Sequence, residues 1–218
     1  DGAEAAQIIT HLARAAGRAV VKSKSMTTEE IHLNAALERA GLQVTETDLG
    51  EYLIQLAGEM PSHITAPAVH MSMEAIAGLL AEKLGVPRYA TPEELTAVVR
   101  RVLRERFLGA DVGISGVNFA VAETGTLVVV ENEGNARLVT SLPRVHIAVM
   151  GIEKVIPRLA DLAVFLTLLP RAATGQRMST YVSLLTGARR PGERDGPEEL
   201  HLVILDNGRG AIHADPAV

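Results

Sequence analysis

The chain has 218 residues, of which 47% are hydrophobic and 22% are charged, a balance that is typical of a globular protein and excludes a disordered chain. The 26 acidic and 21 basic residues give a net charge of −5, and aromatic residues make up only 3%, so we expect no nucleic-acid-binding surface. The absence of cysteine excludes a disulfide framework and any thiolate-bound iron–sulfur cluster within the chain.

The apolar segments are too short to span a membrane. A bilayer needs roughly 20 apolar residues in a row, whereas the longest candidate, Leu159–Leu169, is interrupted by Asp161 and Thr167. The N-terminus also lacks the apolar core of a signal peptide. We therefore expect no membrane span and a cytoplasmic location.

The first elements along the chain are a strand, a helix and a second strand. Arg18–Ser23 is predicted to be a short buried strand. A helix is expected from Thr27 to about Ala40, because Glu30 follows Thr27 at capping-box spacing and Gly41 follows the helix. Gln43–Asp48 is predicted to be the next strand.

Two longer helices are expected in the next part of the chain. Ile64–Pro67 is predicted to be a short strand that leads into a helix over Ser72–Leu84, which ends at Gly85. A second helix begins at Thr91-Pro92-Glu93-Glu94, with threonine as the cap and proline at the first helical position, and continues to Phe107.

The segment Gly113–Thr140 is rich in β-branched residues and is predicted to be a meander of strands. Within it, Glu123-Thr124-Gly125 separates the apolar runs Phe119–Ala122 and Thr126–Val130, which is typical of a tight reversal between two strands. Val145–Met150 is predicted to be a further strand.

The last part of the chain combines one helix with at least one strand. Pro157–Leu169 is apolar on most sides and is predicted to be a buried helix. Tyr181–Leu185 is ambiguous, and Arg189–Pro197 is predicted to be a loop. Leu200–Leu205 is the final predicted strand, which ends at the turn signal Asn207-Gly208.

Alternation of strands and helices favours a layered α/β fold with a mainly parallel sheet. The composition does not change along the chain in a way that marks a domain boundary. We therefore expect one domain over residues 1–218, in which residues 1–110 form an α/β lobe and residues 111–218 form a strand-rich half that completes the sheet.

Several polar residues follow predicted strands, and in open α/β sheets ligands gather at the carboxyl ends of strands. We therefore expect these residues to meet in one cleft. Glu123 is the candidate catalytic residue, as a general base, a ligand-binding group or a nucleophile; the alternative is a solvated acidic turn. No metal-binding residue is predicted. The candidate ligand-binding residues are Lys22, Lys24, Asn118, Thr124, Glu133, Asn135, Arg137, Glu153, Thr174, Gln176 and Asp206.

Three of these groups suit an anionic or polar ligand. Lys22 and Lys24 precede a helix start, where a phosphate or carboxylate binds well; the alternative is a basic strand end. Arg137 suits a two-pronged contact with a carboxylate, or an internal ion pair that closes the loop. Gly175, between Thr174 and Gln176, suits a loop that approaches a ligand with its backbone.

The chain resembles the lactate-utilisation (LUD) domain family, in particular the LUD domains of its iron–sulfur subunits. The resemblance covers nearly the whole chain, in family order. It is carried by Lys22-Ser23-Lys24-Ser25-Met26, Asp48-Leu49-Gly50-Glu51-Tyr52, Gly113–Arg137, Val145–Lys154, Ala173-Thr174-Gly175-Gln176, Asp195–His201 and Leu205-Asp206-Asn207-Gly208-Arg209.

The resemblance implies a Rossmann-like fold related to ribose-5-phosphate isomerase and the CoA transferases. It also implies an iron–sulfur subunit of a complex that oxidises L-lactate to pyruvate with two other lactate-utilisation subunits, and a small carboxylate- or phosphate-bearing ligand. In the family the cysteine clusters follow the region of Asp206–Arg209, so the chain is expected to be cut before them. The alternatives are a CoA-transferase-like or phosphosugar-handling enzyme that uses Glu123, although its Ser-Glu-Asn-Gly pattern is missing, and a non-catalytic docking module.

Overall fold

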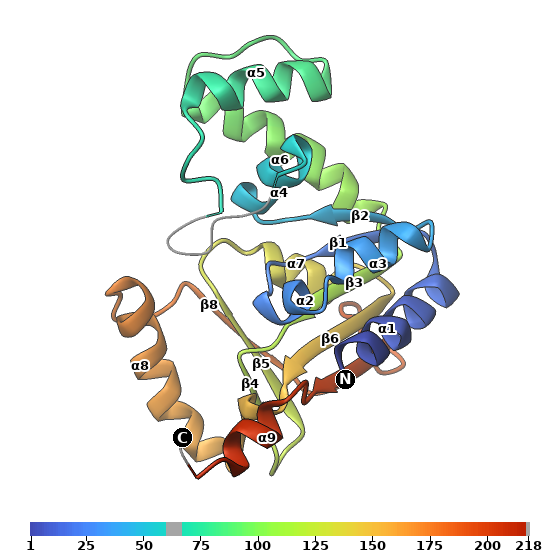
Figure 1. Cartoon of the computed structure of the whole chain (residues 1–218), viewed down its shortest axis with the longest axis vertical. Coiled ribbons are helices and arrows are strands. Elements are labelled where there is room, and N and C mark those ends of the chain that lie inside the picture. Colours follow the sequence, from blue (N-terminus) through green and yellow to red (C-terminus); the bar gives the residue numbers. More distant parts are fainter. Residues whose placement is uncertain (60–66, 217–218) are drawn as a thin grey trace.

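A parallel sheet lies at the centre of the computed structural model, which describes residues 1–59 and 67–216 (Figure 1). All neighbouring strands of this sheet are parallel, as the alternating pattern predicts. Its central strands are buried apolar runs, as expected for a sheet that is covered on both faces. In spatial order the strands are β2 (Gln43–Glu46), β1 (Ala19–Lys22), β3 (Val112–Gly116), β6 (Val145–Gly151) and β9 (Glu199–Leu205).

Helices cover both faces of the sheet (Figure 1). On one face α1 (Gly2–Ala16) and α3 (Leu33–Arg39) bury apolar side chains against the strands, together with Ile31, which directly follows α2 (Met26–Glu30). The helices of the second core are α4 (Leu49–Ala57), α5 (Met73–Leu84), α6 (Pro92–Leu108) and α7 (Asn135–Ser141). Residues of β6 alternate between the faces: Val145, Ile147 and Val149 belong to the first core, and Ala148 and Met150 to a third.

A smaller second sheet packs against β6 through this third core. In it β4 and β5 form an antiparallel hairpin, as predicted around Glu123-Thr124-Gly125. The ambiguous segment Tyr181–Leu185 is a strand. In spatial order the strands are β7 (Val155–Ile156), β4 (Phe119–Val121), β5 (Thr126–Glu131) and β8 (Tyr181–Leu185). The remaining elements are η1 (Ile152–Lys154), η2 (Leu159–Asp161), α8 (Leu162–Thr174) and α9 (Arg209–Ala214).

The predicted single helix over Thr27–Ala40 is wrong, because the structure has two short helices there. They are separated at His32, which adopts the left-handed conformation with φ 50°. The first helix, α2, follows Ser25 and does not begin with the predicted capping box of Thr27 and Glu30. The Thr28 hydroxyl donates a hydrogen bond to the Ser25 carbonyl. The break lets both Ile31 and Leu33 enter the first core.

The predicted meander over Gly113–Thr140 is wrong after Glu131, where α7 replaces the last strand. Both carboxylate oxygens of Glu131 accept hydrogen bonds from backbone N–H groups in the first turn of α7, from Ala136 at 2.8 Å and Arg137 at 2.6 Å. This carboxylate satisfies donors that a helix leaves free at its start. The local cap therefore outweighs the strand propensity of Leu138–Thr140.

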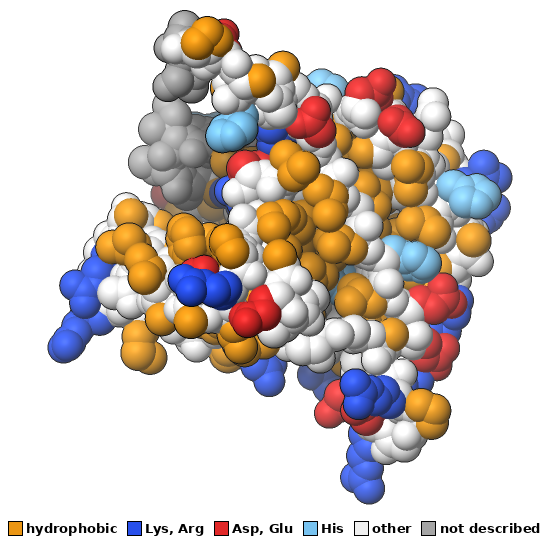
Figure 2. All heavy atoms as spheres, turned by 90° about the horizontal axis from the view of Figure 1, so that it is seen from below, with side chains coloured by type: hydrophobic (Ala, Val, Ile, Leu, Met, Phe, Trp, Pro, Cys, Tyr) orange, Lys and Arg blue, Asp and Glu red, His pale blue; other side chains and the backbone are white. Residues whose placement is uncertain are grey.

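The helix predicted over Pro157–Leu169 begins later, at Leu162, and is not buried. Val164, Phe165 and Leu168 are 58%, 38% and 57% exposed. Figure 2 views the molecule from the lower side of Figure 1, where hydrophobic side chains gather in the middle of the face. Exposed apolar side chains on β8 and β9, including Leu184 and Ile204, add to the apolar surface of this half of the chain.

Besides α7, the helices α1, α4 and α9 were not anticipated from the sequence. The first, α1, begins with a capping box between Asp1 and Glu4, and α4 begins where the Asp48 side chain accepts the Glu51 N–H. The predicted strand Ile64–Pro67 lies, except for Pro67 in a turn, outside the described residues. Among the helices of the described part, none is long and apolar enough to cross a membrane.

Candidate functional site

A cavity of about 460 Å³ lies at the carboxyl end of the central sheet. The chain passes from β1 to β2 on one side and places β3 on the other side of β1, so the strand order reverses between β1 and β3. Ligands of open α/β sheets bind at this kind of switch point. We call the cavity the switch-point pocket; its walls are residues 23–27, Asp48, residues 116–118, residues 129–133, Asn135, Ala136 and Lys154.

Two lysines line the switch-point pocket from different strand ends. Lys24 follows β1, and its side chain is 34% exposed. The Lys24 Nζ lies 3.8 Å from Glu51 Oε1, a loose ion pair that leaves its N–H groups able to turn to a ligand. Lys154 ends η1 after β6 and lies 3.8 Å from the carboxylate of Glu153. The pocket therefore offers two cationic groups to an anion.

The carboxylates in the pocket walls have structural partners or, for Glu133, a raised pKa. Asp48 caps α4, and Glu131 caps α7. Glu133 is exposed as a whole, yet desolvation of its carboxyl raises its pKa, and the nearby charges of Asp48 and Glu131 add to the shift. Lys24 acts in the opposite direction on the pKa of Glu133. A protonated Glu133 would repel an anionic ligand less.

Three asparagines complete the polar walls, and two of them, Asn118 and Asn135, are fixed by groups next to the pocket. Asn118 Oδ1 accepts the Val130 N–H at 2.8 Å, which fixes the side chain between β3 and β5. Asn135 Nδ2 donates to Thr47 Oγ1 at 3.3 Å, and the Thr47 hydroxyl donates to the Lys22 carbonyl. The backbone of β5 thereby holds the Asn118 side chain at the pocket, and the hydroxyl of Thr47 after β2 holds the Asn135 side chain.

Lys22 does not reach the switch-point pocket, which corrects its prediction as a ligand-binding residue. Its side chain is 1% exposed, and its Nζ lies 2.9 Å from Glu46 Oε1 and donates to Thr28 Oγ1 at 3.1 Å. Side chains alternate along a strand, so Lys22 and Ser23 point to different sides at the end of β1. Lys22 is a buried structural cation.

Glu123 and Thr124 lie apart from the pocket, which corrects the expectation of one cleft. Both belong to the β4–β5 turn at the start of β5, whereas the pocket walls use the end of β5. Six residues of strand separate these ends by roughly 20 Å. Glu123 Oε2 accepts the Leu159 N–H at 2.9 Å, and Thr124 Oγ1 contacts Thr126 Oγ1 at 2.7 Å. The nearest partners of Glu123 thus hold the turn against η2.

Glu153 and Asp206 belong to a second polar cluster at the ends of β6 and β9. Arg209 Nε lies 2.6 Å from Glu153, and its Nη2 lies 2.8 Å from Glu30. Asp206 Oδ1 accepts the Gly210 N–H at the start of α9. These acids follow strand ends, as predicted, but their oxygens are occupied by Arg209 and by backbone.

The other predicted residues lie on the rim or on the outside. Gln176 Oε1 accepts hydrogen bonds from Thr174 Oγ1 and from Asn132 Nδ2, at 2.8 and 2.9 Å. Because Asn132 lines the pocket, this loop touches its rim. The Arg137 side chain is exposed on α7 and does not line the pocket. Of the predicted residues, the structure brings together Lys24, Asn118, Glu133 and Asn135.

The comparisons with known proteins decide the family. The family model described as the LUD domain matches residues 1–205. The chain belongs to the LUD domain family. Lactate utilization protein B of Anoxybacillus flavithermus is 54% identical to this LUD domain over 194 residues, which cover 88% of the chain and 41% of that protein. The protein of this name in Bacillus pumilus is 52% identical over 96% of the chain and 44% of its own length.

Another relative of this LUD domain carries a different name. The uncharacterized electron transport protein YkgF of Escherichia coli is 53% identical over 90% of the chain and 42% of that protein. The LUD domain therefore spans less than half the length of the curated relatives that we compare. Among solved structures, a DUF162 family protein from Deinococcus radiodurans matches 71% of this chain and 93% of its own, with 18% identity and a TM-score of 0.34.

Asp48 and Lys154 line the pocket of this LUD domain but were not predicted as site residues. Both lie at the ends of predicted strands, so the rule that placed Lys24 at the sheet edge would also have found them.

His146, by contrast, is a core residue: it is 1% exposed, and its Nε2 lies 2.8 Å from Ser115 Oγ. Desolvation lowers the pKa of His146 to about 4, which keeps it neutral.

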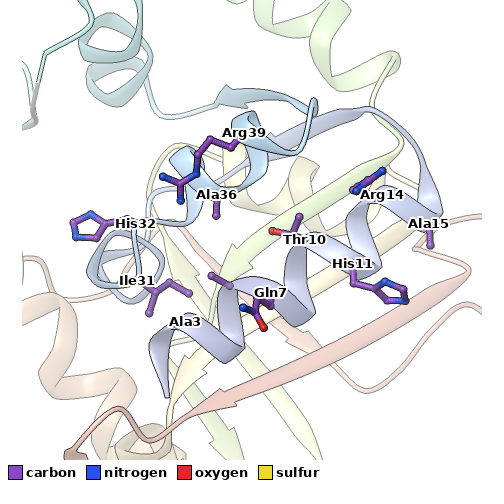
Figure 3. A pocket seen from close by; sticks show the side chains of 11 residues that line it. Ala3, Gln7, Thr10, His11, Arg14, Ala15, Ile31, His32, Ala36 and Arg39 are labelled. Carbon is purple, nitrogen blue, oxygen red and sulfur yellow. The ribbon is translucent and has the colours of Figure 1, made fainter.

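Another cavity of the LUD domain, about 880 Å³, lies elsewhere (Figure 3). Figure 3 shows that its labelled side chains come from α1 and from residues 31–39. The bases His11, Arg14, His32 and Arg39 on its walls are all exposed. Its walls come from surface helices and not from residues at the ends of strands, so we place the candidate site at the switch-point pocket.

Glu51, the partner of Lys24, should make stability depend on pH. Burial, followed by the charges of Glu29 and Glu46, raises the pKa of Glu51 from 4.5 to about 7. The folded protein then holds a proton that the unfolded chain releases, so this group lowers stability as pH rises from about 4.5 to 7. Glu51→Gln should remove this loss. The difference in free energy of unfolding between the variant and the parent should therefore shift in favour of the variant by about 2 kcal/mol between pH 5 and pH 8.

Urea denaturation at both pH values measures this difference. Glu38→Gln serves as the control, because Glu38 is exposed and should give the same difference in stability at both pH values. If Glu51→Gln gave the same pH profile as the parent, Glu51 would be ionised normally in the folded protein.

Proposed function

We propose that this LUD domain is part of an iron–sulfur subunit of a cytoplasmic complex that oxidises L-lactate to pyruvate with two other lactate-utilisation subunits. The observation that carries the proposal is the 51–54% identity to several proteins named lactate utilization protein B. The electron transport name of the Escherichia coli relative supports a redox role. Since the chain spans 41–44% of these relatives, the activity belongs to a longer protein and its complex.

The iron–sulfur clusters of this proposal do not fit the residues of the chain. Such clusters are held by cysteine thiolates, and the chain contains no cysteine. Other parts of the subunit would therefore bind them. We derive no electron-transfer step within this LUD domain.

Within the complex, we propose that the switch-point pocket holds a small carboxylate- or phosphate-bearing ligand, for which L-lactate and pyruvate are the first candidates. Lys24 and Lys154 supply positive charge, and the asparagines Asn118 and Asn135 supply amide groups for a hydroxyl or carbonyl oxygen. These groups stand on different strand ends, so the backbone fixes their spacing. The proposed role of the domain is to bind and orient the ligand.

Lys24→Met tests the ligand proposal. Titration calorimetry of the chain with L-lactate, pyruvate and phosphate should show binding that weakens at least about tenfold in the variant, because a charge-assisted hydrogen bond contributes about 1.5–3 kcal/mol. Lys83→Met, at an exposed position of α5, is the matched control and should bind like the parent. Equal binding by the Lys24 variant and the parent would contradict the proposal.

A genetic experiment tests the function of the whole protein. The Lys24→Met change in the parent gene should slow growth on L-lactate and leave growth on glucose intact. The alternative enzyme that uses Glu123 gains no support from the geometry, because Glu123 lies outside the pocket and its carboxylate holds a backbone N–H. The docking module would instead be favoured if alanine at both Glu123 and Arg137, and also Lys24→Met, left growth on lactate unchanged.

A further inference from the structure

A second cavity, of about 340 Å³, lies among α2, α3, β2 and α4. We call it the acidic cavity. Its only basic wall residue among those described is His32. Its glutamates are Glu29, Glu38, Glu46, Glu51 and Glu59. Lys24 connects the two cavities, because it lines the switch-point pocket while its Nζ contacts Glu51.

Two of these glutamates are buried and incompletely satisfied. The side chains of Glu46 and Glu51 are 5% and 6% exposed. Glu46 Oε2 and Glu51 Oε1 are without a hydrogen-bond partner among residues 1–59 and 67–216. Native proteins pair nearly all such atoms, so each unpaired oxygen calls for a donor.

The neighbouring donors do not form hydrogen bonds with these two oxygens. On Glu46, both Lys22 and Asn34 contact the same oxygen, Oε1, at 2.9 and 2.6 Å. On Glu51, Lys24 lies 3.8 Å away, beyond hydrogen-bonding distance. Each of these two buried carboxylates on the cavity wall therefore has one oxygen without a hydrogen-bond donor among the described residues.

The walls indicate what kind of cation would fit. No group of three acidic or histidine side chains in the described part of the chain is arranged to hold a metal ion. Leu33, Ala35 and Ile54 add apolar surface to the cavity. A cation with N–H donors and an aliphatic stem matches both features, because its head can donate to carboxylates while its stem contacts the apolar wall.

We propose that the acidic cavity binds an alkylammonium or alkylguanidinium group, whose N–H donors bond Glu46 Oε2 and Glu51 Oε1. The site is separate from the carboxylate site of the proposed function and does not depend on it. The same chemistry exists in free amines and in the lysine or arginine side chains of a partner protein. The experiment distinguishes these two sources.

Titration calorimetry at pH 7 tests the proposal with four probes: 1,4-diaminobutane, butylguanidine, and short peptides that carry one lysine or one arginine in a neutral sequence. We expect at least one probe to bind at millimolar concentration or below. Binding of the free amines alone would assign a small-molecule ligand, and preferred binding of a peptide would assign a protein side chain. Failure of all four probes would overturn the proposal.

Glu51→Gln should weaken binding of the active probe at least about tenfold, because it replaces the charged acceptor by a neutral one. Glu38→Gln is the matched control: it removes the same charge from the same cavity at an exposed position, and a change below about twofold is expected. Equal weakening by both variants would show that only the general negative charge of the cavity attracts the cation. No weakening by Glu51→Gln would show that the cation does not bond Glu51. Either result would overturn the site.

A measurement on the parent protein alone completes the test. Four charged groups from separate elements act on Glu51: Glu29, Glu46, Lys24 and Lys22. A cation that bonds Glu51 favours its ionised form, so binding at pH 7 should release about half a proton, measured from the binding heat in two buffers of different ionisation enthalpy. No proton release at pH 7 would mean that the cation binds away from Glu51.

Discussion

Replacing Gly113 with alanine is expected to lower the free energy of unfolding by about 3–5 kcal/mol. Gly113 lies in β3, between its partners Val21 in β1 and His146 in β6. A Cβ atom at this position would lie 2.0 Å from the carbonyl oxygen of Val139 and 3.0 Å from its carbonyl carbon. These are backbone atoms of α7, so no side-chain rotation relieves the overlap, and α7 must move off the sheet.

Urea denaturation of Gly113→Ala measures this loss, and Gly78→Ala is its control. Gly78 lies in α5, and apart from the backbone of its own helix and its two chain neighbours no atom of the described residues lies within 4 Å of an added Cβ. Alanine there should stabilise the protein by about 0.5–1 kcal/mol, because glycine is a poor helix former. Since α7 carries Asn135, the Gly113 variant should also bind the pocket ligand more weakly. A Gly113 variant as stable as the parent would show that α7 packs less closely on β3.

Lys22→Met should have the second large effect, also a loss of about 3–5 kcal/mol. Lys22 and Glu46 form an ion pair at 2.9 Å with side chains 1% and 5% exposed. Removing the lysine leaves the Glu46 charge buried without its main counter-charge, which costs more than the intact pair contributes.

The double variant Lys22→Met with Glu46→Met separates the charge effect from packing. We expect it to be more stable than Lys22→Met alone, because no buried charge is left unpaired. Lys83→Met, whose ion pair with Glu82 is exposed, should change the free energy of unfolding by less than about 0.5 kcal/mol. If the double variant were less stable than Lys22→Met, the contacts of Glu46, including its hydrogen bond from Asn34, would contribute more than its unpaired charge costs.

The elements that the sequence predicts well have strong local signals. Thr91-Pro92-Glu93-Glu94 forms the predicted capping box with proline in the first turn, and Ser72 caps the helix that ends at Gly85. Buried strands such as Val145–Met150 were found because every residue is enclosed by helices and strands. The class of the fold follows from their alternation.

The errors arise where a specific contact, or the lack of a surface to pack against, overrides the pattern of apolar residues. Glu131 caps α7, which begins four residues later at Asn135, and this helix takes the place of the predicted last strand. The apolar segment Leu162–Leu169 reads as a core helix from its composition, yet it packs on the second sheet through few residues and leaves most of its side chains exposed. Composition shows that a side chain prefers burial, but only the three-dimensional packing shows whether a surface is available.

For the candidate site, we expected the residues at the carboxyl ends of predicted strands to meet in one cleft. Lys24 does line the switch-point pocket, but Glu123 does not. The rule applies to the parallel sheet, to which β1 belongs. Glu123 lies instead on the hairpin of the second sheet, and the strand order that separates the two sheets is not visible in the sequence. Lys22 and Lys24 are two residues apart, yet one is buried and the other reaches a pocket, because Glu46 on the neighbouring strand holds the first.

The order of strands in the central sheet also bears on how the protein folds. The pairing of Val20 with Val112 joins positions about ninety residues apart, and closing a loop of that length costs about 4 kcal/mol of chain entropy. Parallel pairing over such distances is slow. During synthesis β1 and β2 must therefore wait for β3 to leave the ribosome, and helices α5 and α6 can form earlier from local contacts. The ligand cavity between β1 and β3 is thus expected to take shape late in folding.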